Sequence, residues 1–497
     1  MTNTNIGTTA RTGIGMVAIL AAFLVMGCAS HDAVDNAETP AATPAQVEDS
    51  EREDVQVQFV GVWEGSLKVQ GAEIDIAVKF LQDPTVAAAA VDLRSVATMD
   101  IPVQMAYGLP LTNVSATGNS AGAAIHFELV TSGPTLVADG EITADAAISG
   151  VFSQGGASGE FALTRVADLE AADLPAAGQT ATGIETAASV EIDGGTLHGT
   201  LLMPETDAQA PLVIIVAGSG PTDRDGNSHI LPGRNDSLKL LAEGLARAGI
   251  ASLRYDKRGL GESVYEGLRE EDLIFADFVN DLLSWVQWAD TRGDLSNTYL
   301  AGHSEGGLIV LSALAADLDV GLGVDPRAAR LARDTVSGVI CIAAPGRVFD
   351  AVVLEQLERS LGPDSALFTS ARQIFAAIRD GSTVPEVPQE LASLFRPSVQ
   401  PYLRSIVQFD PAVLAAATPQ PLLVVNGVED LQVPVSEAEA LSAARPDARL
   451  VVIPGMNHVL KIVPPADLAA NQRSYTDPSF GLSEELVNAV SEFVLGQ

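Results

Sequence analysis

A pentapeptide near the middle of the chain has the composition and spacing of a reactive serine. Residues 302–306 read Gly-His-Ser-Glu-Gly, directly after the run 298–301 and before the apolar residues 307–311. This order predicts a strand, a sharp turn and a helix, which together expose a serine Oγ at the end of a parallel sheet. Such a turn is strained and crowded, which explains the flanking glycines. The spacing therefore predicts Ser304 as the nucleophile of an acyl-transfer reaction.

A serine hydroxyl becomes a good nucleophile when a base removes its proton and a carboxylate orients that base. In one known chain order of this triad, both partners follow the serine, the acid before the histidine. His458 is the only histidine after Ser304, and it follows an apolar run, 450–453, that ends at a Pro-Gly turn. His458 is therefore the predicted base. His303, directly before the serine, is expected to point away from the triad.

The acid is expected at the end of the preceding apolar run, residues 421–425. Asp430 follows this run and is the predicted acid, with the adjacent Glu429 as an alternative. In the triad hypothesis the Asp430 carboxylate orients His458. Asp430 also has a second interpretation, in which it only caps the helix that begins near Ser436.

The oxygen that becomes negative during acyl transfer needs two backbone N–H donors. One is expected at Glu305, the residue after the serine, and the other at Ser219. Ser219 lies in the Gly-rich turn 217–220, which follows the apolar run 212–216 and could also simply precede a helix. Because this turn lacks a full G-x-G-x-x-G pattern, no dinucleotide cofactor is predicted.

No metal site is predicted either. Residues 223–227 read Asp-Arg-Asp-Gly-Asn, which resembles part of a calcium loop but lacks the closing glutamate at EF-hand spacing. This segment is expected to shape the oxyanion loop. Arg254, Asp256 and Arg258 follow a predicted strand and are expected to pair with one another or with this segment. A clamp for a substrate anion is the alternative for these three residues.

Three segments, 218–226, 253–263 and 302–307, resemble secreted bacterial α/β-hydrolases of the esterase and serine aminopeptidase-like (S33) type. The resemblance runs from about residue 189 to the C-terminus. It implies an α/β-hydrolase fold with a helical cap insertion, preceded by a small antiparallel all-β domain. Such hydrolases carry the pattern Gly-x-x-Asp-x-x-Val, present here at 427–433, at the position of the triad acid.

The N-terminal segment, residues 1–28, predicts export. Arg11 precedes the apolar stretch 13–26, which is short for a transmembrane helix. Residues 25–28 read Val-Met-Gly-Cys and resemble a bacterial lipobox, in which Cys28 becomes the lipidated first residue. An ordinary cleaved signal peptide is the alternative. We therefore expect a lipoprotein in the bacterial cell envelope that contacts the membrane only through Cys28.

The remaining chain divides into two predicted domains, since 497 residues exceed a single core. Residues 29–54 are acidic, lack apolar periodicity and are expected to form a disordered linker. Alternating apolar residues and Gly or Pro turns over 55–166 predict an antiparallel β-domain. A second linker is expected at 167–185. Strand and helix patterns alternate over 186–497 and predict a mostly parallel sheet with helices on both faces.

Residues 347–420, between two predicted strands, have an amphipathic helical pattern interrupted by prolines. The family resemblance implies that an insertion here forms a cap over the active site. Its apolar side chains are expected either to wall an acyl or leaving-group pocket or to form the core of the cap: Leu354, Leu357, Phe368, Ile374, Phe375 and Phe395.

Composition limits the possible partners. The formal net charge of −36 argues against nucleic acid, whose binding needs a basic surface. Apart from Cys28 the chain has one cysteine, Cys341, in an apolar run, so we expect a buried thiol and no cysteine catalysis.

Together these features predict an exported serine hydrolase that cleaves a small carboxylic ester. A peptidase that shortens peptides from the N-terminus is an alternative, because Glu355, Glu358 and Asp364 of the cap could bind an α-ammonium group. Proline-releasing relatives carry Gly-Gly-Ser-Trp-Gly at the serine, which this chain lacks. A non-catalytic alternative is an envelope binding protein on a hydrolase scaffold, although the complete triad argues against it. The sequence makes no prediction of oligomeric state.

Overall fold

The fold is described from a computed structural model of the chain. The described residues are 61–69, 72–80, 97–101, 106–119, 122–129, 135–143, 147–167, 183–206, 208–228, 231, 233–315 and 323–496. The predicted signal peptide with its lipobox, the predicted linker 29–54 and most of the predicted linker 167–185 lie outside them.

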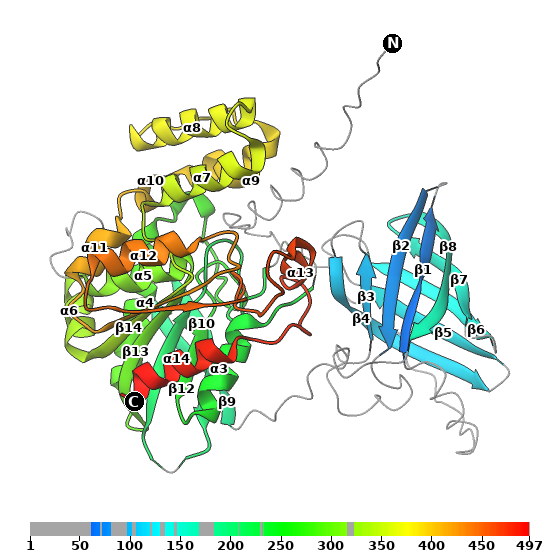
Figure 1. The fold of residues 1–497 in the computed structure, drawn as a ribbon, viewed down its shortest axis with the longest axis horizontal. Coiled ribbons are helices and arrows are strands. Elements are labelled where there is room, and N and C mark those ends of the chain that lie inside the picture. The colour runs from blue at the N-terminus through cyan, green and yellow to red at the C-terminus, as the bar shows by residue number, and fades with distance from the viewer. Residues whose placement is uncertain are drawn as a thin grey trace.

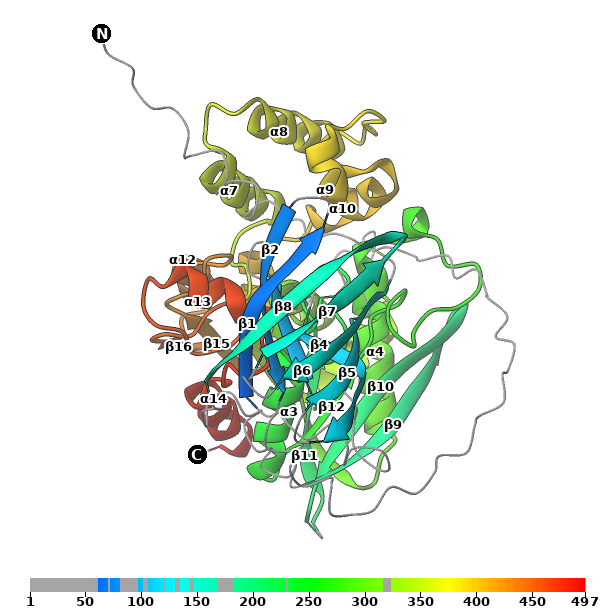
Figure 2. The same ribbon diagram turned by 90° about the vertical axis from the view of Figure 1, so that its right-hand side faces the viewer.

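The first folded part is a closed barrel of eight antiparallel strands in chain order, in which β1 pairs with both β2 and β8 (Figure 2). Alternate side chains of each strand point to the barrel interior, as the period of two requires. The interior is filled by apolar side chains, and Trp63 and Phe80 meet edge to face with ring centroids 6.4 Å apart. The predicted antiparallel β-domain is confirmed. The strands are β1 (Gly61–Val69), β2 (Ala72–Phe80), β3 (Ala97–Ile101), β4 (Ala106–Asn119), β5 (Gly122–Leu129), β6 (Leu136–Thr143), β7 (Ala147–Gln154) and β8 (Ala157–Ala167).

The second part is an eight-stranded sheet in the order β16-β15-β14-β13-β11-β12-β10-β9 (Figure 1). Strands β9, β10 and β12 are joined by antiparallel pairing, and all other neighbours are parallel. The central parallel strands are nearly continuous apolar runs because helices cover both of their faces. The strands are β9 (Gly183–Ile192), β10 (Gly195–Pro204), β11 (Ala210–Val216), β12 (Ala251–Tyr255), β13 (Leu295–His303), β14 (Val336–Ile342), β15 (Leu422–Gly427) and β16 (Arg449–Ile453).

Helices pack on both faces of this sheet. On one face, apolar side chains of α3 and α14 share a core with β11 and β15, and on the other face α4, α5 and α6 form a larger core. A short 3₁₀ turn, Glu270–Asp272, precedes α4, which begins at Phe275. The helices are α3 (Ser237–Arg247), α4 (Phe275–Asp290), α5 (Glu305–Leu314), α6 (Pro326–Thr335), α12 (Val435–Ala444), α13 (Leu468–Arg473) and α14 (Glu484–Leu495).

Five helices lie in the predicted insertion between β14 and β15, and α7 and α8 stand beyond the end of the sheet (Figure 1). Most of the apolar side chains expected there are buried in the larger core, and Leu354 is half-buried against it. Phe375 and Phe395 meet edge to face with centroids 4.9 Å apart. The helices are α7 (Phe349–Leu361), α8 (Ala366–Arg379), α9 (Ala392–Phe395), α10 (Gln400–Ile406) and α11 (Pro411–Ala417).

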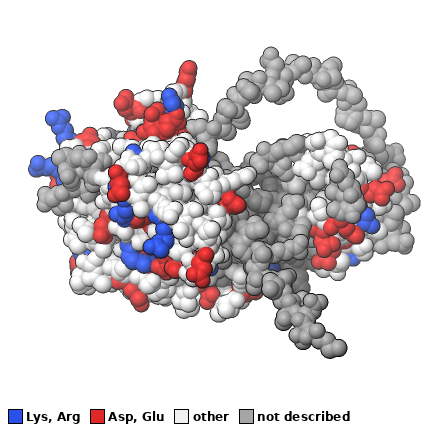
Figure 3. Space-filling model, turned by 90° about the horizontal axis from the view of Figure 1, so that it is seen from above, with Lys and Arg blue, Asp and Glu red and all other residues white. Residues whose placement is uncertain are grey.

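Acidic side chains lie in several separate groups over the face shown in Figure 3, and basic side chains accompany some of them. This distribution agrees with the net charge of −36.

None of the described helices combines the length and the hydropathy needed to cross a lipid bilayer.

Candidate active site

Ser304 lies in the sharp turn between β13 and α5, as the sequence predicts. Its φ of 55° and ψ of −123° are unusual for a residue with a side chain, and its amide donates to the Ile342 carbonyl at 2.9 Å. A Cβ at Gly302 would overlap the Gly306 carbonyl oxygen, and a Cβ at Gly306 would overlap the Val216 carbonyl oxygen. The two glycines of the pentapeptide are therefore required by the close approach of the backbone.

His458 and Asp430 form a buried pair behind this turn. The His458 Nδ1 lies 2.9 Å from the Asp430 Oδ2, and the two side chains are 5% and 0% exposed. The other carboxylate oxygen, Oδ1, accepts the backbone N–H groups of Gln432 and Val433, each at 2.8 Å. These two amides fix the carboxylate plane, so that Oδ2 is left to face the imidazole.

The alternatives for the acid have different environments. Glu429 Oε2 accepts the amide of Ala466 at 3.0 Å, which directs that carboxylate away from the imidazole. Asp430 does not cap the next helix, because α12 begins at Val435 with Pro434 as its N-cap. The geometry therefore favours Asp430 over Glu429 as the partner of His458.

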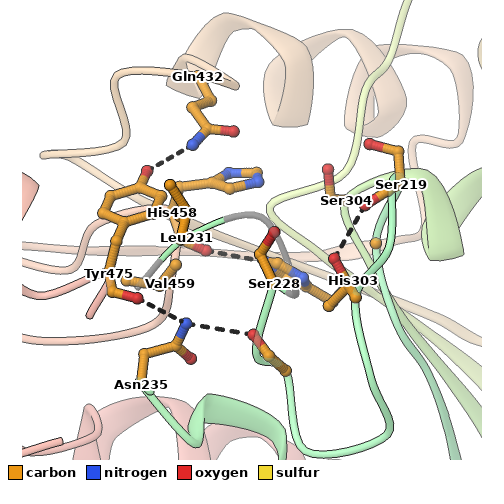
Figure 4. Close-up of a pocket in the computed structure, with 13 residues that line it drawn as sticks. Ser219, Ser228, Leu231, Asn235, His303, Ser304, Gln432, His458, Val459 and Tyr475 are labelled. Atoms are coloured by element: carbon orange, nitrogen blue, oxygen red, sulfur yellow. Dashed lines mark hydrogen bonds between the residues drawn. The ribbon is translucent and has the colours of Figure 1, made fainter. Parts of the chain in front are cut away.

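Ser304 and His458 line one pocket, which has a volume of about 60 Å³ (Figure 4). In this view the His458 ring points toward the Ser304 hydroxyl, and Ser219 lies beside Ser304. Among the described residues that line the pocket there is no aspartate, glutamate, lysine or arginine. The lining residues are Gly218, Ser219, Thr222, Gly226, Ser228, Leu231, Asn235, His303, Ser304, Gln432, His458, Val459 and Tyr475.

The two predicted oxyanion donors flank the nucleophile. Glu305 is the first residue of α5, so its amide has no acceptor within the helix. Ser219 follows β11 and lines the pocket, and a Cβ built on the adjacent Gly218 would lie 3.1 Å from the Ser304 Cβ. The Gly-rich turn 217–220 therefore lies directly against Ser304.

The expected orientation of His303 is wrong. His303 is buried and lines the pocket, and its ring centroid lies 4.9 Å from that of His458. Burial is the main cause that lowers the pKa of His303 to about 3, so the ring is neutral near pH 7. Its Nε2 lies 2.8 Å from the His458 carbonyl oxygen and donates to it. His303 thus holds the backbone of the loop that carries His458.

Lys257 is a buried residue of this site that the sequence did not predict, although predictions were made for the charged residues Asp256 and Arg258 on either side of it. Its side chain is 1% exposed, its Nζ donates to the Gly218 carbonyl, and the same Nζ lies 3.9 Å from the Glu305 Oε1. Burial lowers the pKa of Lys257 and raises the pKa of Glu305. A charged side chain directly after the buried strand β12 was the available signal.

The charged side chains near the Gly-rich turn form ion pairs: Arg254 and Asp256 pair with the segment 223–227 as expected, whereas Arg258 pairs outside it, with Asp281 of α4. Arg224 Nη2 lies 2.6 Å from Asp256 Oδ2, and Arg258 Nε donates to Asp281 at 2.8 Å. Asp223 Oδ1 accepts the amide of Asn227 at 2.8 Å, which shapes the loop from within. Over the described part of the chain, no group of three or more His, Cys, Asp or Glu side chains is arranged to hold a metal ion.

The insertion does not wall this pocket. All of residues 347–420 are described, and none of them lines it. The insertion instead contacts the loop beside the pocket, where Gln356 Nε2 of α7 donates to the Gln432 carbonyl at 2.8 Å. Of the acids considered for α-ammonium binding, Glu355 forms an ion pair with Arg347 at 2.6 Å.

Part of the chain is similar in sequence to known hydrolases. Residues 227–325 match the family model described as serine aminopeptidase, S33. Esterase EstD of Thermotoga maritima is 28% identical over 269 residues, which are 53% of this chain, and the chain spans 58% of the length of that relative.

Among solved structures, Est1E from Butyrivibrio proteoclasticus is 22% identical, with a TM-score of 0.39 over 62% of this chain and 98% of its own. A thermophilic esterase from Thermogutta terrifontis is 20% identical, with a TM-score of 0.36 over 63% and 98%. From residue 183 onward the chain has a mostly parallel sheet with a serine in a sharp strand-to-helix turn, and in sequence this part is similar to serine aminopeptidases of the S33 type and to an esterase.

Proposed function

We propose that this protein is a serine hydrolase that cleaves carboxylic esters through an acyl-enzyme. The observation that carries the proposal is the buried His458–Asp430 pair, 2.9 Å apart, beside a serine held in a strained turn. Neither a helix cap nor a core contact requires that a histidine lining the same pocket as Ser304 be paired with a buried carboxylate behind it.

In the proposed first half-reaction, Ser304 Oγ attacks the ester carbonyl carbon while His458 Nε2 accepts the hydroxyl proton. Asp430 Oδ2 accepts the Nδ1–H of the imidazole and stabilises its cation. The negative oxygen of the tetrahedral intermediate accepts the amides of Glu305 and Ser219. When the C–O bond breaks, His458 returns its proton to the leaving alcohol. A water molecule then repeats the sequence on the acyl-enzyme and releases the acid.

The pocket supports a short, uncharged acyl group. A volume of about 60 Å³ corresponds to roughly four to six water-sized positions, at about 10–15 Å³ for each. An acetyl or butyryl group fits that number of positions, whereas an octanoyl group exceeds it. The names of the relatives, which are esterases, also favour an ester substrate.

The aminopeptidase alternative has less support. An α-ammonium group needs a nearby carboxylate when it leaves water. No described residue that lines the pocket carries one, and the acids Glu355, Glu358 and Asp364 are not among its lining residues.

For the insertion, we propose a cap role that concerns the leaving group rather than the acyl chain. Helix α7 of the insertion contacts the loop that follows Asp430, beside the pocket, through Gln356. The apolar side chains of the insertion lie in the hydrophobic core and not in the pocket wall. Substitutions of α7 side chains near the pocket opening should therefore alter the selectivity for the leaving alcohol and leave the preference for acyl chain length unchanged.

Export and anchoring are proposed from the sequence alone. Arg11, the apolar stretch 13–26 and Cys28 support a lipoprotein signal. Metabolic labelling with a palmitate analogue should modify the wild-type chain in a bacterial host and should not modify Cys28→Ser. Equal labelling of both would contradict the anchor.

The proposed reaction is tested by turnover of p-nitrophenyl acetate, butyrate and octanoate, with alanine p-nitroanilide as the peptide surrogate. We expect kcat/KM to be highest for acetate or butyrate, to fall for octanoate and to be undetectable for the anilide. Ser304→Ala should abolish all turnover. A folded wild-type protein without any Ser304-dependent turnover would instead favour the envelope binding protein, and preferential anilide cleavage would favour the peptidase.

A further inference from the structure

Two ionisable side chains behind the active site have no part in the reaction proposed above. Lys257, which follows β12, is 1% exposed, and Glu305, the first residue of α5, is 5% exposed. A single buried charge is costly, and a buried pair is tolerated only with good partners. Lys257 Nζ meets three of them: the Gly218 carbonyl, the Glu305 carboxylate at 3.9 Å and the Phe278 ring at 5.9 Å.

The contact with Gly218 determines where the next amide points. The Gly218 carbonyl and the Ser219 N–H belong to one peptide unit, which is planar and trans, so the two groups point in opposite directions. Lys257 holds the carbonyl oxygen in the protein interior. The Ser219 N–H is thereby directed to the opposite side, where Ser219 and Ser304 line the pocket.

The contact between Lys257 and Glu305 connects the Ser219 amide with the second expected oxyanion donor. The backbone N–H of Glu305 is this second expected oxyanion donor. The carboxylate of the same residue is the counterion of Lys257, which orients the Ser219 N–H. One ion pair therefore spans the two sides of the oxyanion hole. The buried Tyr402 of α10 packs against the same aromatic neighbour of the lysine, because its ring meets the Phe278 ring edge to face at 5.7 Å.

We propose that Lys257 and Glu305 are positioning residues that hold both oxyanion donors in place, Lys257 by fixing the Gly218–Ser219 peptide and Glu305 by fixing Lys257. This inference rests on the proposed function. It assigns neither side chain a proton-transfer step.

The expected kinetic signature separates positioning from simple stabilisation. An oxyanion hole binds the transition state more tightly than the substrate, so its misalignment lowers kcat and leaves KM nearly unchanged. Loss of one donor typically costs about 10²–10³ in kcat. Lys257→Met keeps the length and removes the charge and the donor, so we expect kcat to fall about 10- to 100-fold. Glu305→Gln keeps an acceptor for Lys257 and should have a smaller effect.

The direct test is inhibition by an aryl trifluoromethyl ketone, which forms a hemiketal whose oxygen occupies the oxyanion hole. For Lys257→Met, its inhibition constant should rise by the same factor by which kcat/KM falls. Glu437→Gln is the matched control, because Glu437 is a fully buried carboxylate that accepts the Gly346 amide and pairs with Arg347. It should lower the melting temperature and leave kcat and the inhibition constant unchanged.

A folded Lys257→Met protein with wild-type kcat and wild-type inhibition would overturn the inference. If this variant does not fold, Glu305→Gln and Lys257→Arg decide the question by the same two measurements. Turnover by the wild type distinguishes failure of the proposed hydrolase function from failure of the positioning role of Lys257 and Glu305. If the wild type shows no Ser304-dependent reaction, the proposed function and this inference both fail, whereas an active wild type with equally active variants refutes only the inference.

Discussion

Replacing Asp430 by asparagine should inactivate the protein through the tautomer of His458. Asp430 Oδ1 accepts two backbone amides at 2.8 Å, and Oδ2 accepts His458 Nδ1–H at 2.9 Å. In Asp430→Asn the two amides select the side-chain oxygen, which places the NH₂ group against His458 Nδ1. The imidazole must then accept at Nδ1 and carry its proton on Nε2, where the serine proton has to be received.

The structure sets the size of this effect. Turning the asparagine over would leave two buried N–H groups facing an NH₂ group, at about 1–3 kcal/mol for each. Both together cost about 2–6 kcal/mol, so the flipped form is populated to a few per cent at most. We therefore expect kcat to fall by about 30-fold to about 10⁴-fold with little change in KM.

The assay is p-nitrophenyl butyrate turnover at pH 7, with the far-ultraviolet circular dichroism and the melting temperature as checks of folding. Glu429→Gln is the matched control, because the Glu429 side chain accepts the Ala466 amide and does not face the imidazole. It should retain wild-type kcat. A folded Asp430→Asn protein with undiminished kcat, or a large loss in Glu429→Gln alone, would refute the assignment of the acid.

Further predictions concern the turn and the residue before the serine. His303→Ala removes the donor to the His458 carbonyl and should lower kcat about 10-fold, whereas His303→Gln retains a donor and should keep most of the activity; steady-state kinetics of both variants distinguish a positioning role from none. Because the folded pKa of His303 is about 3 and the unfolded value is about 6.5, the unfolded chain binds the proton first as the pH falls. The free energy of unfolding should therefore drop by about 2 kcal/mol from pH 6.5 to pH 5 through this group, and urea titrations should find that part missing in His303→Gln. Gly302→Ala places a Cβ on the Gly306 carbonyl oxygen and should cost about 3 kcal/mol or more, while Gly293→Ala, whose Cβ would meet nothing within 4 Å, should stay within about 0.5 kcal/mol; equal melting temperatures of the two variants would contradict the crowding argument.

The residues that carry the proposed chemistry were predictable because each follows the end of a strand, the serine and the aspartate within recognisable motifs and the histidine as a rare residue type. Ser304 lies between two glycines after β13, and His458 is the only histidine beyond it. Parallel strands bring their carboxyl ends to one edge of a sheet, so β13, β15 and β16 deliver Ser304, Asp430 and His458 to the same place.

The supporting contacts could not be predicted, because they join residues that are distant in sequence. Lys257 reaches Gly218 across 39 positions, and His303 reaches the His458 carbonyl across 155. A charged or imidazole side chain next to a motif looks the same in the sequence whether it faces solvent or a carbonyl oxygen.

Hydrophobic periodicity elsewhere in the chain likewise predicted secondary structure but not which distant residues come into contact. The alternating pattern of the N-terminal domain predicted antiparallel strands but not the pairing of β1 with β8 that closes the barrel. The amphipathic pattern of the insertion predicted buried apolar faces, but it could not distinguish a pocket wall from the core in which Phe375 and Phe395 meet.

The proposed mechanism forms a covalent acyl group on Ser304, which intact-protein mass spectrometry can detect. The wild type is mixed with a fluorophosphonate, or quenched in acid during turnover of p-nitrophenyl butyrate, and the modified peptide is sequenced. We predict a single adduct of the phosphonyl or butyryl mass on Ser304, absent from Ser304→Ala and slowed in Asp430→Asn. An unmodified wild-type protein, or an adduct on another residue, would contradict the account.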